Sequence, residues 1–173
     1  MLGLQRGTVK LVPSTPEWIT LFHTERARLQ QALGADALDI QHIGSTAVPG
    51  LAAKPILDLG IAVAADTVAA ACIPRLTALG YTYREYRGPG EGYFFDQGSE
   101  QQLTHYLHLL PIHEVGWRNY LLFRDYLRAQ PEARTAYMRL KEELASQYAE
   151  DRAAYSAAKA SFIQHILMLA FLA

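Results

Sequence analysis

The segment between His42 and Ile61 combines backbone and side-chain groups that could bind a phosphorylated ligand. An extended run ends at Gly44 and Ser45, and an aliphatic strand then carries a single acid, Asp58. An isolated carboxylate in an apolar strand is costly to bury unless it is paired or holds a metal ion. A Gly-Ser corner that opens a helix offers backbone N–H groups, which suit an anion such as phosphate. An acid beside a phosphate cradle is what metal-dependent chemistry on a nucleotide requires.

Alternation along the strand predicts the direction of the Asp58 side chain. In residues 56–63, Asp58 shares one face with Gly60, whereas the other face carries only leucine, isoleucine and valine. We therefore expect Asp58 to face a cleft, with Gly60 leaving room beside it. Twelve residues separate Ser45 from Asp58, so a short helical segment could return the chain and place both near the ends of adjacent strands.

Longer motifs resemble the GrpB family. They are HIGSTAVPGL (42–51), KPILD (54–58), THYLH (104–108), FRDYLR (123–128), PEAR (131–134) and the spaced Tyr155, Lys159 and Phe162. The resemblance covers nearly the whole chain. It implies a nucleotidyltransferase-like α+β fold, with a mixed β-sheet, flanking helices and a helical C-terminal section. It also implies one domain over residues 1–173, with a core at about 1–112 and C-terminal helices at about 113–173.

The resemblance also implies a divalent metal, Mg²⁺, Mn²⁺ or Zn²⁺. In active members of the wider superfamily, two acidic residues two positions apart on one strand and a third acidic residue on a later strand bind the metal. In this chain, Gly60 stands at the position of the second acidic residue. One carboxylate is a poor Mg²⁺ site without other oxygen ligands. His108 or His105 could supply a ligand or a general base, and because they are three apart on a strand only one can face Asp58. We expect Mn²⁺ or Zn²⁺ to be preferred, and Gly60→Asp to tighten Mg²⁺ binding.

Each candidate also has a purely structural interpretation. Asp58 could pair with Lys54 or cap a backbone N–H group. The histidines, including His42 beside the corner, could be hydrogen-bonded residues that hold the sheet edge. Thr46 could be only a helix cap.

The C-terminal helices add positive charge. Arg124 and Arg128 share one helix face, for which we favour a solvated surface with ion pairs. Arg152, Tyr155 and Lys159 form a stripe at i, i+3 and i+7 that could hold a triphosphate or a ribose.

Two functions are consistent with these residues, and a structural partner without ligand is a third. The first is a transferase that moves a nucleotidyl or related phosphate group to a small molecule, with Asp58 and His108 on the metal and His108 or His105 as catalytic partner. The second is a non-catalytic nucleotide- or anion-binding module that lacks the second metal-binding carboxylate. The predicted phosphate- or substrate-binding residues are Gly44, Ser45, Thr46, Lys54, Tyr155 and Lys159.

Composition argues against other classes. The net charge of the 173 residues is -1, so no basic field recruits nucleic acid. The one cysteine, Cys72, cannot form an intrachain disulfide and is expected to be buried. The N-terminus lacks a signal-peptide core, and the apolar end at 162–173 is too short to span a bilayer. We expect that end to be a core helix, and the protein to be cytoplasmic without a membrane partner.

Hydrophobic periodicity and turn residues predict the elements that position these groups. Strands are predicted at 9–12, 38–43, 55–63, 81–86, 93–96 and 103–110, with a loop at 87–92. Helices are predicted at 16–33, 66–79, 115–129, 131–148 and 151–173, with a turn or two at 49–53.

Overall fold

The computed structural model describes residues 2–88 and 90–173. Its five-stranded sheet has the order β1-β2-β5-β4-β3, in which β2 and β5 are parallel and the other neighbouring pairs are antiparallel. The strands are β1 (Asp39–Ile43), β2 (Leu57–Val63), β3 (Thr82–Tyr86), β4 (Tyr93–Gly98) and β5 (Leu103–Pro111). This mixed sheet with flanking helices confirms the predicted α+β fold.

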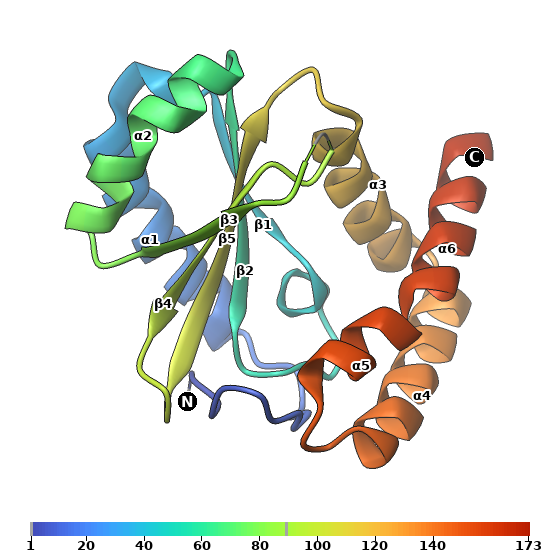
Figure 1. Cartoon of the computed structure of the whole chain (residues 1–173). Helices are drawn as coiled ribbons and strands as arrows, with labels where there is room; N and C mark the ends of the chain where they lie inside the picture. The colour runs from blue at the N-terminus through green and yellow to red at the C-terminus, as the bar shows by residue number, and fades with distance from the viewer. Residues whose placement is uncertain (1, 89) are drawn as a thin grey trace.

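Helices cover the two faces of the sheet unequally (Figure 1). One face carries α1 (Glu17–Leu33) and α2 (Asp66–Ala78). On the other side lie α3 (Val115–Ala129), α4 (Pro131–Gln147), α5 (Arg152–Ala158) and α6 (Ala160–Leu172). Two short 3-10 helices complete the chain, η1 (Gly34–Asp36) and η2 (Ser45–Ala47).

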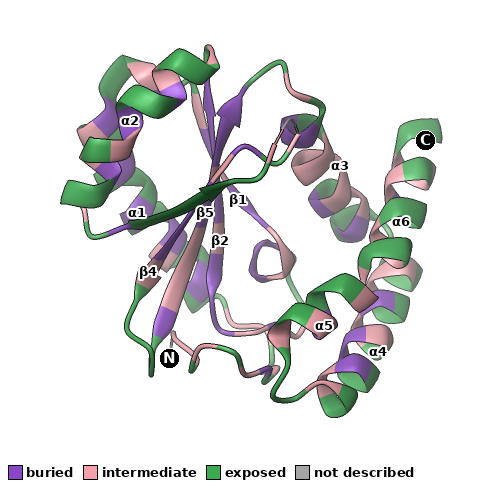
Figure 2. Ribbon diagram, viewed as in Figure 1, coloured by how far each residue is buried: buried purple, intermediate pink, exposed green. Residues whose placement is uncertain are grey.

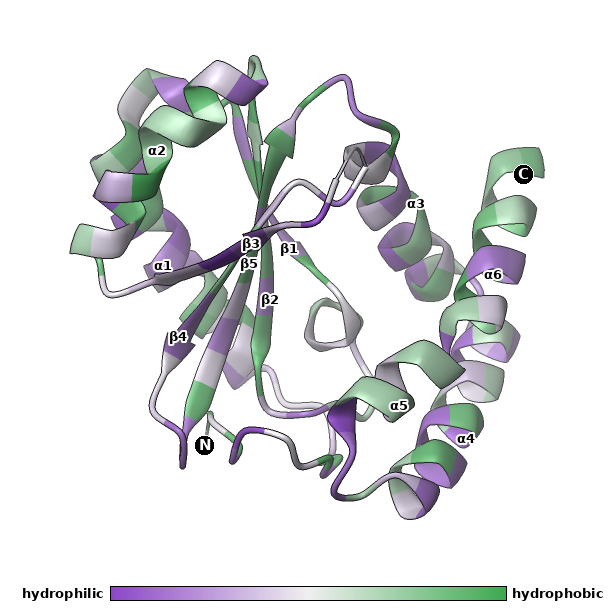
Figure 3. Cartoon of the chain, in the orientation of Figure 1, coloured by the Kyte–Doolittle hydropathy of each residue, from purple (hydrophilic) through white to green (hydrophobic). Residues whose placement is uncertain are grey.

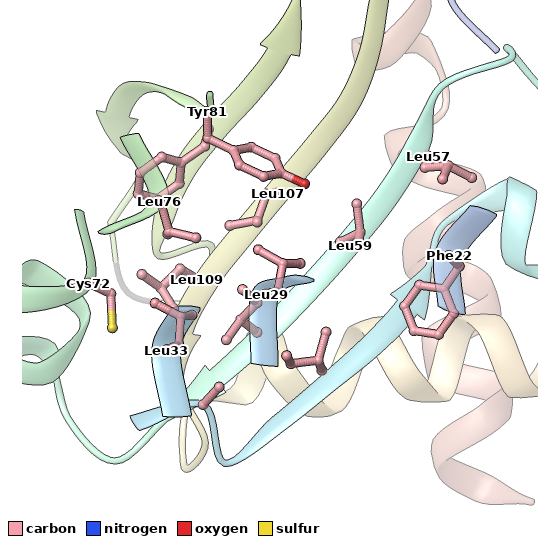
Figure 4. Packing of buried hydrophobic residues seen from close by; sticks show 14 of the residues in the cluster. Phe22, Leu29, Leu33, Leu57, Leu59, Cys72, Leu76, Tyr81, Leu107 and Leu109 are labelled. Atoms are coloured by element: carbon pink, nitrogen blue, oxygen red, sulfur yellow. The ribbon is translucent and has the colours of Figure 1, made fainter. Parts of the chain in front are cut away.

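The main core fills the space between the sheet and helices α1 and α2. Leu57 and Leu59 of β2 are fully buried there, in the same cluster as Leu29 of α1, and Leu59 lies close to Leu29 (Figure 4). Cys72 belongs to the same cluster and is also fully buried, as predicted. Burial of one such leucine contributes about 1.5–3 kcal/mol, so this face of β2 fixes the strand in the sheet.

The opposite face of β2 is packed only at one end. Trp117 of α3 lies over Ala62 and Leu110 there, and its ring also covers Gly60. A Cβ atom at position 60 would lie 3.0 Å from Trp117 Cζ3 and 3.4 Å from Ile43 Cδ1. The expectation that Gly60 leaves room beside Asp58 was wrong, because the indole ring fills that space.

Most predicted elements are present, but several details differ. Residues 9–12 form no strand, and Val12 makes only an isolated bridge to Ala53. The helical turn expected at 49–53 lies earlier, at η2. The last helix is divided at Lys159 into α5 and α6. The predicted loop at 87–92 contains Pro89, which lies outside the described residues.

The C-terminal helix is apolar but not buried. Within α6 only Ile166 is buried, while Met168, Phe171 and Leu172 are exposed. The helix is thus mostly hydrophobic (Figure 3) yet largely exposed (Figure 2), which contradicts the prediction of a core helix. Among the described residues, one stretch, Arg152–Leu172, is long and apolar enough by composition to cross a membrane.

The packing around Gly60 predicts the effect of substitutions there. Gly60→Asp should lower the free energy of unfolding by roughly 2 kcal/mol or more, because it overpacks the Trp117 contact and adds a carboxylate. Urea unfolding would measure this, with Gly60→Ala expected to show a smaller loss. Addition of Mg²⁺ should not restore the stability. If Gly60→Asp has the same free energy of unfolding as the wild type, the Trp117 indole moves aside and the predicted overpacking is wrong.

Candidate functional site

The Gly-Ser corner and the acid are in direct contact. Ile43 pairs with Asp58 across β1 and β2, so the corner that follows Ile43 lies against the carboxylate. Gly44 has a φ of 67°, and a Cβ atom there would lie 2.5 Å from Asp58 Oδ2. Glycine is required here both for this left-handed conformation and for the close approach. The juxtaposition expected from the spacing is therefore confirmed.

A buried lysine holds the corner from the helical side. Lys141 of α4 is 1% exposed, and its Nζ donates hydrogen bonds to Ser45 Oγ at 3.2 Å and to the Ala52 carbonyl oxygen. Sequence analysis missed Lys141. The available signal is its position three and four residues from Leu144 and Tyr137, which places it on the buried face of α4.

Two arginines of α3 fix the chain on both sides of the corner. Arg124 donates to the His42 carbonyl oxygen at 3.0 Å, and Arg128 donates to the Ala47 carbonyl oxygen at 2.8 Å. Arg124 is itself buried and also binds Asp125 through two nitrogens. The expected ion pairs are present, since Arg124 and Arg128 both pair with Asp125. The expectation of a solvated face was wrong, because Arg124 is buried and both guanidinium groups bind the loop backbone.

Three lysines surround the Asp58 carboxylate. Burial raises the pKa of Asp58 to about 6, although the charges of Lys54, Lys159 and Lys141 act in the opposite direction. Burial lowers the pKa of Lys54 and of Lys141 to about 7, and that of Lys159 to about 8. None of the ion pairs within residues 2–88 and 90–173 involves Asp58. The direct pairing with Lys54 considered above is therefore not formed.

Each of the three ammonium groups lies near a tyrosine ring, and Lys141 Nζ is 5.1 Å from the centroid of the Tyr137 ring. The Nζ atoms of Lys159 and Lys54 lie 4.3 and 5.4 Å from the centroid of the buried Tyr155 ring. Lys54 Nζ also lies 5.8 Å from the Tyr106 ring. Arg152 contacts Tyr106 Oη at 2.9 Å, but its other nitrogens bind the Gln5 and Thr8 carbonyl oxygens. Arg152 therefore anchors the N-terminal segment, whereas the ammonium groups of Lys54 and Lys159 donate no hydrogen bond to another residue within 2–88 and 90–173.

The histidines divide between the two faces of the sheet. His108 pairs with Gly60 in the parallel register and lies on the Asp58 face, with its Nδ1 3.0 Å from Tyr120 Oη. Burial lowers its pKa to about 3, so the ring is neutral. His105 pairs with Leu57 on the opposite face, where it contacts Thr104. The role proposed for His105 in the cleft is therefore wrong, because its side chain points away from Asp58.

His42 and Thr46 hold each other near the corner. The His42 Nε2 and Thr46 Oγ1 atoms are 2.9 Å apart, and the imidazole stacks on Phe22 at 4.8 Å between centroids. Both residues are buried. Thr46 borders the cleft, but its hydroxyl group is engaged by His42, so we assign both residues to positioning of the loop.

The cleft carries few groups that could bind a metal ion. In one row of the sheet, Tyr106 lies between Asp58 and Asp96, but each carboxylate oxygen of Asp96 accepts hydrogen bonds from Arg6 and Arg84. Within the described ranges, no cluster of three histidine, cysteine, aspartate or glutamate side chains could hold a metal. Asp58, with three lysines around it, does not fit the two-metal centre that the fold family implies.

The site consists of two adjoining pockets. The larger has a volume of about 820 Å³ and is bordered by the three lysines, Tyr155 and Tyr106. The second, of about 490 Å³, extends between α3 and α6. Five residues border both pockets: Ser45, Asp58, His108, Ser156 and Lys159. Seven of the nine predicted site residues thus border the larger pocket and Gly44 borders the second, whereas His105 borders neither.

Comparison with known proteins identifies the family. The model of the GrpB protein family matches residues 8–168. The chain belongs to the GrpB family. It is 34% identical over 171 residues to the glutamate-rich protein GrpB of Alkalihalophilus pseudofirmus, with 96% of this chain and 98% of that protein covered. A UPF0157 protein of Pseudomonas aeruginosa is also 34% identical, over 92% of this chain and 66% of its own length.

Solved structures show the same fold. The crystal structure of GrpB from Enterococcus faecalis has a TM-score of 0.85 and 30% identity, over 94% of this chain and 98% of that one. Cid1, solved in complex with its short product ApU, has a TM-score of 0.53 and 17% identity over 84% of this chain and 48% of Cid1. The likeness to Cid1 establishes a nucleotidyltransferase-like fold for this GrpB chain and nothing about its activity.

The lowered lysine pKa values predict a pH dependence of stability. Burial holds the pKa of Lys54, Lys141 and Lys159 at about 7 to 8, below the ordinary 10.5. Above neutral pH the unfolded chain therefore binds more protons than the folded protein, and the free energy of unfolding should rise with pH. We expect a gain on the order of 1–3 kcal/mol between about pH 7 and pH 9.5.

Urea unfolding across this range would measure the gain, and Lys159→Met should reduce it. Lys10 is exposed and lies outside both pockets, so Lys10→Met serves as the matched control and should keep the wild-type profile. A stability that is flat or falls over the same range would contradict the buried cationic cluster.

Proposed function

We propose that this GrpB protein binds a phosphorylated small molecule, such as a nucleotide, with lysine side chains rather than metal ions neutralising the phosphates. One observation carries the proposal. The chain contains four lysines, Lys10, Lys54, Lys141 and Lys159, and the last three border the same pocket. They come from the loop before β2, from α4 and from the junction of α5 and α6, so only the folded chain brings them together.

The charge balance of the cleft favours an anionic ligand. Desolvation of an ammonium group is costly unless an opposite charge lies nearby. Three ammonium groups act on the Asp58 carboxylate, whose own pKa is raised to about 6 by burial. The border of the larger pocket also carries four other carboxylates and three arginines, namely Glu85, Asp96, Glu150, Asp151, Arg84, Arg87 and Arg152. A phosphate chain would supply the missing negative charge and would accept charge-assisted hydrogen bonds from Lys54 and Lys159. Binding would then restore the charged forms of the lysines and draw protons from solution.

The same residues argue against a metal as the main phosphate ligand. Mg²⁺, Mn²⁺ and Zn²⁺ each require several oxygen or nitrogen donors in one place. Asp58 and a neutral His108 are the donors that β2 and β5 offer here, because the second acid position is Gly60. Asp96 is held by arginines, and Glu85 is paired with Arg87. Neighbouring ammonium groups would also repel a cation. Lysines therefore replace the metals in this proposal.

A second candidate function is a phosphoryl or nucleotidyl transferase, favoured by the position and pKa of Asp58. With a pKa of about 6, Asp58 could accept a proton from an acceptor hydroxyl near neutral pH. The hydroxyl oxygen would form a bond to phosphorus as the bond to the leaving phosphate breaks, and the lysines would stabilise the leaving anion. His108 lies on the same face and would help to orient the acceptor.

Calorimetric titration with inorganic pyrophosphate and with ATP would test the binding proposal. Both anions should bind in EDTA about as tightly as in Mg²⁺, because the lysines supply the countercharge. Lys159→Met and Lys54→Met should each weaken binding about 10- to 100-fold, while Lys10→Met should leave it unchanged. Binding that requires Mg²⁺, or that survives both cleft substitutions, would contradict the proposal.

Substitution of the acid separates a metal site from an anion site. Asp58→Asn removes a negative charge beside the ligand phosphates, so it should tighten pyrophosphate binding about 3- to 10-fold if lysines are the ligands. If Asp58 holds a metal, the same variant should bind more weakly in Mg²⁺ or Mn²⁺. If Asp58→Asn binds pyrophosphate more tightly but no longer transfers a phosphoryl or nucleotidyl group that the wild type transfers, the transferase candidate is supported.

A further inference from the structure

The second pocket differs in chemistry from the cationic one. Outside the five shared residues, its border is mostly aromatic and aliphatic, with Tyr120 and Phe123 of α3, Tyr137 of α4, and Ile163 and Leu167 of α6. Glu91 is the one further charged residue on this border. Its volume of about 490 Å³ lies within the range of small-molecule sites, roughly 300–1,000 Å³. A neutral, ring-bearing group fits this lining better than a second phosphate chain.

Ring packing makes one wall of this pocket rigid. The Tyr137 ring stacks on Phe162 with 5.1 Å between centroids and meets Phe123 edge-on at 5.4 Å. Tyr120 is held by its contact with His108 Nδ1. Fixed aromatic walls of this kind favour a flat ring, because stacking then needs little reordering of the protein.

Two side-chain amides add hydrogen-bonding capacity at the same place. Asn119 of α3 and Gln164 of α6 both border the second pocket. Neither side chain takes part in a hydrogen bond with another described residue. Each amide offers both donors and an acceptor, which is the set that reads the polar edge of a nucleobase.

Lys159 joins the two pockets. It lies between the last residue of α5 and the first residue of α6, and at this break in the helix it borders both pockets. A ligand whose phosphates lie among the lysines would pass Lys159 and Ser45 before it enters the space between α3 and α6. The two pockets therefore suit one molecule with an anionic part and a flat neutral part.

We infer that the ligand is a nucleoside polyphosphate, with its phosphates at Lys54, Lys141 and Lys159 and its base in the pocket between α3 and α6. This inference rests on the proposed function, since it assumes that the lysine pocket binds phosphates. It adds the base subsite and the residues that recognise the base. Asn119 and Gln164 would contact the base edge, and Phe123 and Tyr137 would supply the apolar wall.

The test compares inorganic triphosphate with the four ribonucleoside triphosphates by calorimetry in EDTA. The base subsite should make at least one nucleotide bind about tenfold or more tightly than triphosphate. Ile163→Trp should fill the subsite and reduce nucleotide affinity to that of triphosphate, while triphosphate affinity stays unchanged and reports that the cleft is folded. Met168→Trp, on an exposed part of α6 outside the pocket, is the matched control and should change neither affinity.

The outcomes distinguish this inference from the proposed function. If triphosphate binds but no nucleotide binds more tightly, the base subsite is wrong and the phosphate site stands. If neither binds, the proposed function itself fails. Equal losses for triphosphate and nucleotide in Ile163→Trp would overturn the separation of the two subsites. If an alkyl diphosphate binds more tightly than any nucleotide, the second pocket binds an aliphatic chain and the proposed base subsite is wrong.

Discussion

The close contact between Gly44 and the Asp58 carboxylate is the constraint around which the cleft is built. It requires glycine at the end of β1, because both the backbone conformation and the space exclude a side chain. It also requires that η2 stay fixed, which Arg124, Arg128 and Lys141 achieve by binding groups on either side of the corner. These three basic side chains of α3 and α4 thus hold the η2 loop against Asp58.

Charge sets the chemistry that this geometry can perform. The nucleotidyltransferase-like fold supplies a strand with an acid and a facing loop, but the chain places lysines where a metal-binding set of carboxylates would be needed. An ammonium group neutralises phosphate without the strict coordination geometry of Mg²⁺. Because desolvation lowers the lysine pKa values, the three lysines carry their positive charge only in part near neutral pH. In the proposed function, an anion would gain affinity by restoring that charge. In the proposed function, the same fold would therefore serve phosphate binding with a different source of countercharge.

The sheet keeps its stability and its site on separate faces. Leucines of β2 pack into the main core against α1 and α2, so the opposite face is free to carry Asp58, Tyr106 and His108 without loss of the central packing. Trp117 closes one end of that opposite face over Gly60.

The sequence alone determined the local features of this protein. The period of apolar residues located nearly all strands and helices, alternation in β2 assigned Asp58 to the less apolar face, and the Gly-Ser spacing placed the corner beside it. Tertiary structure decided what depends on contacts between distant segments. The strand register places His108, and not His105, on the Asp58 face. Packing of α3 places Trp117 against Gly60. Packing of α4 places Lys141 beside Ser45, which is 96 positions away in the sequence. The periodicity of the sequence predicts on which face of its own helix or strand a residue lies. Which residues it contacts depends on how that helix or strand packs against the others.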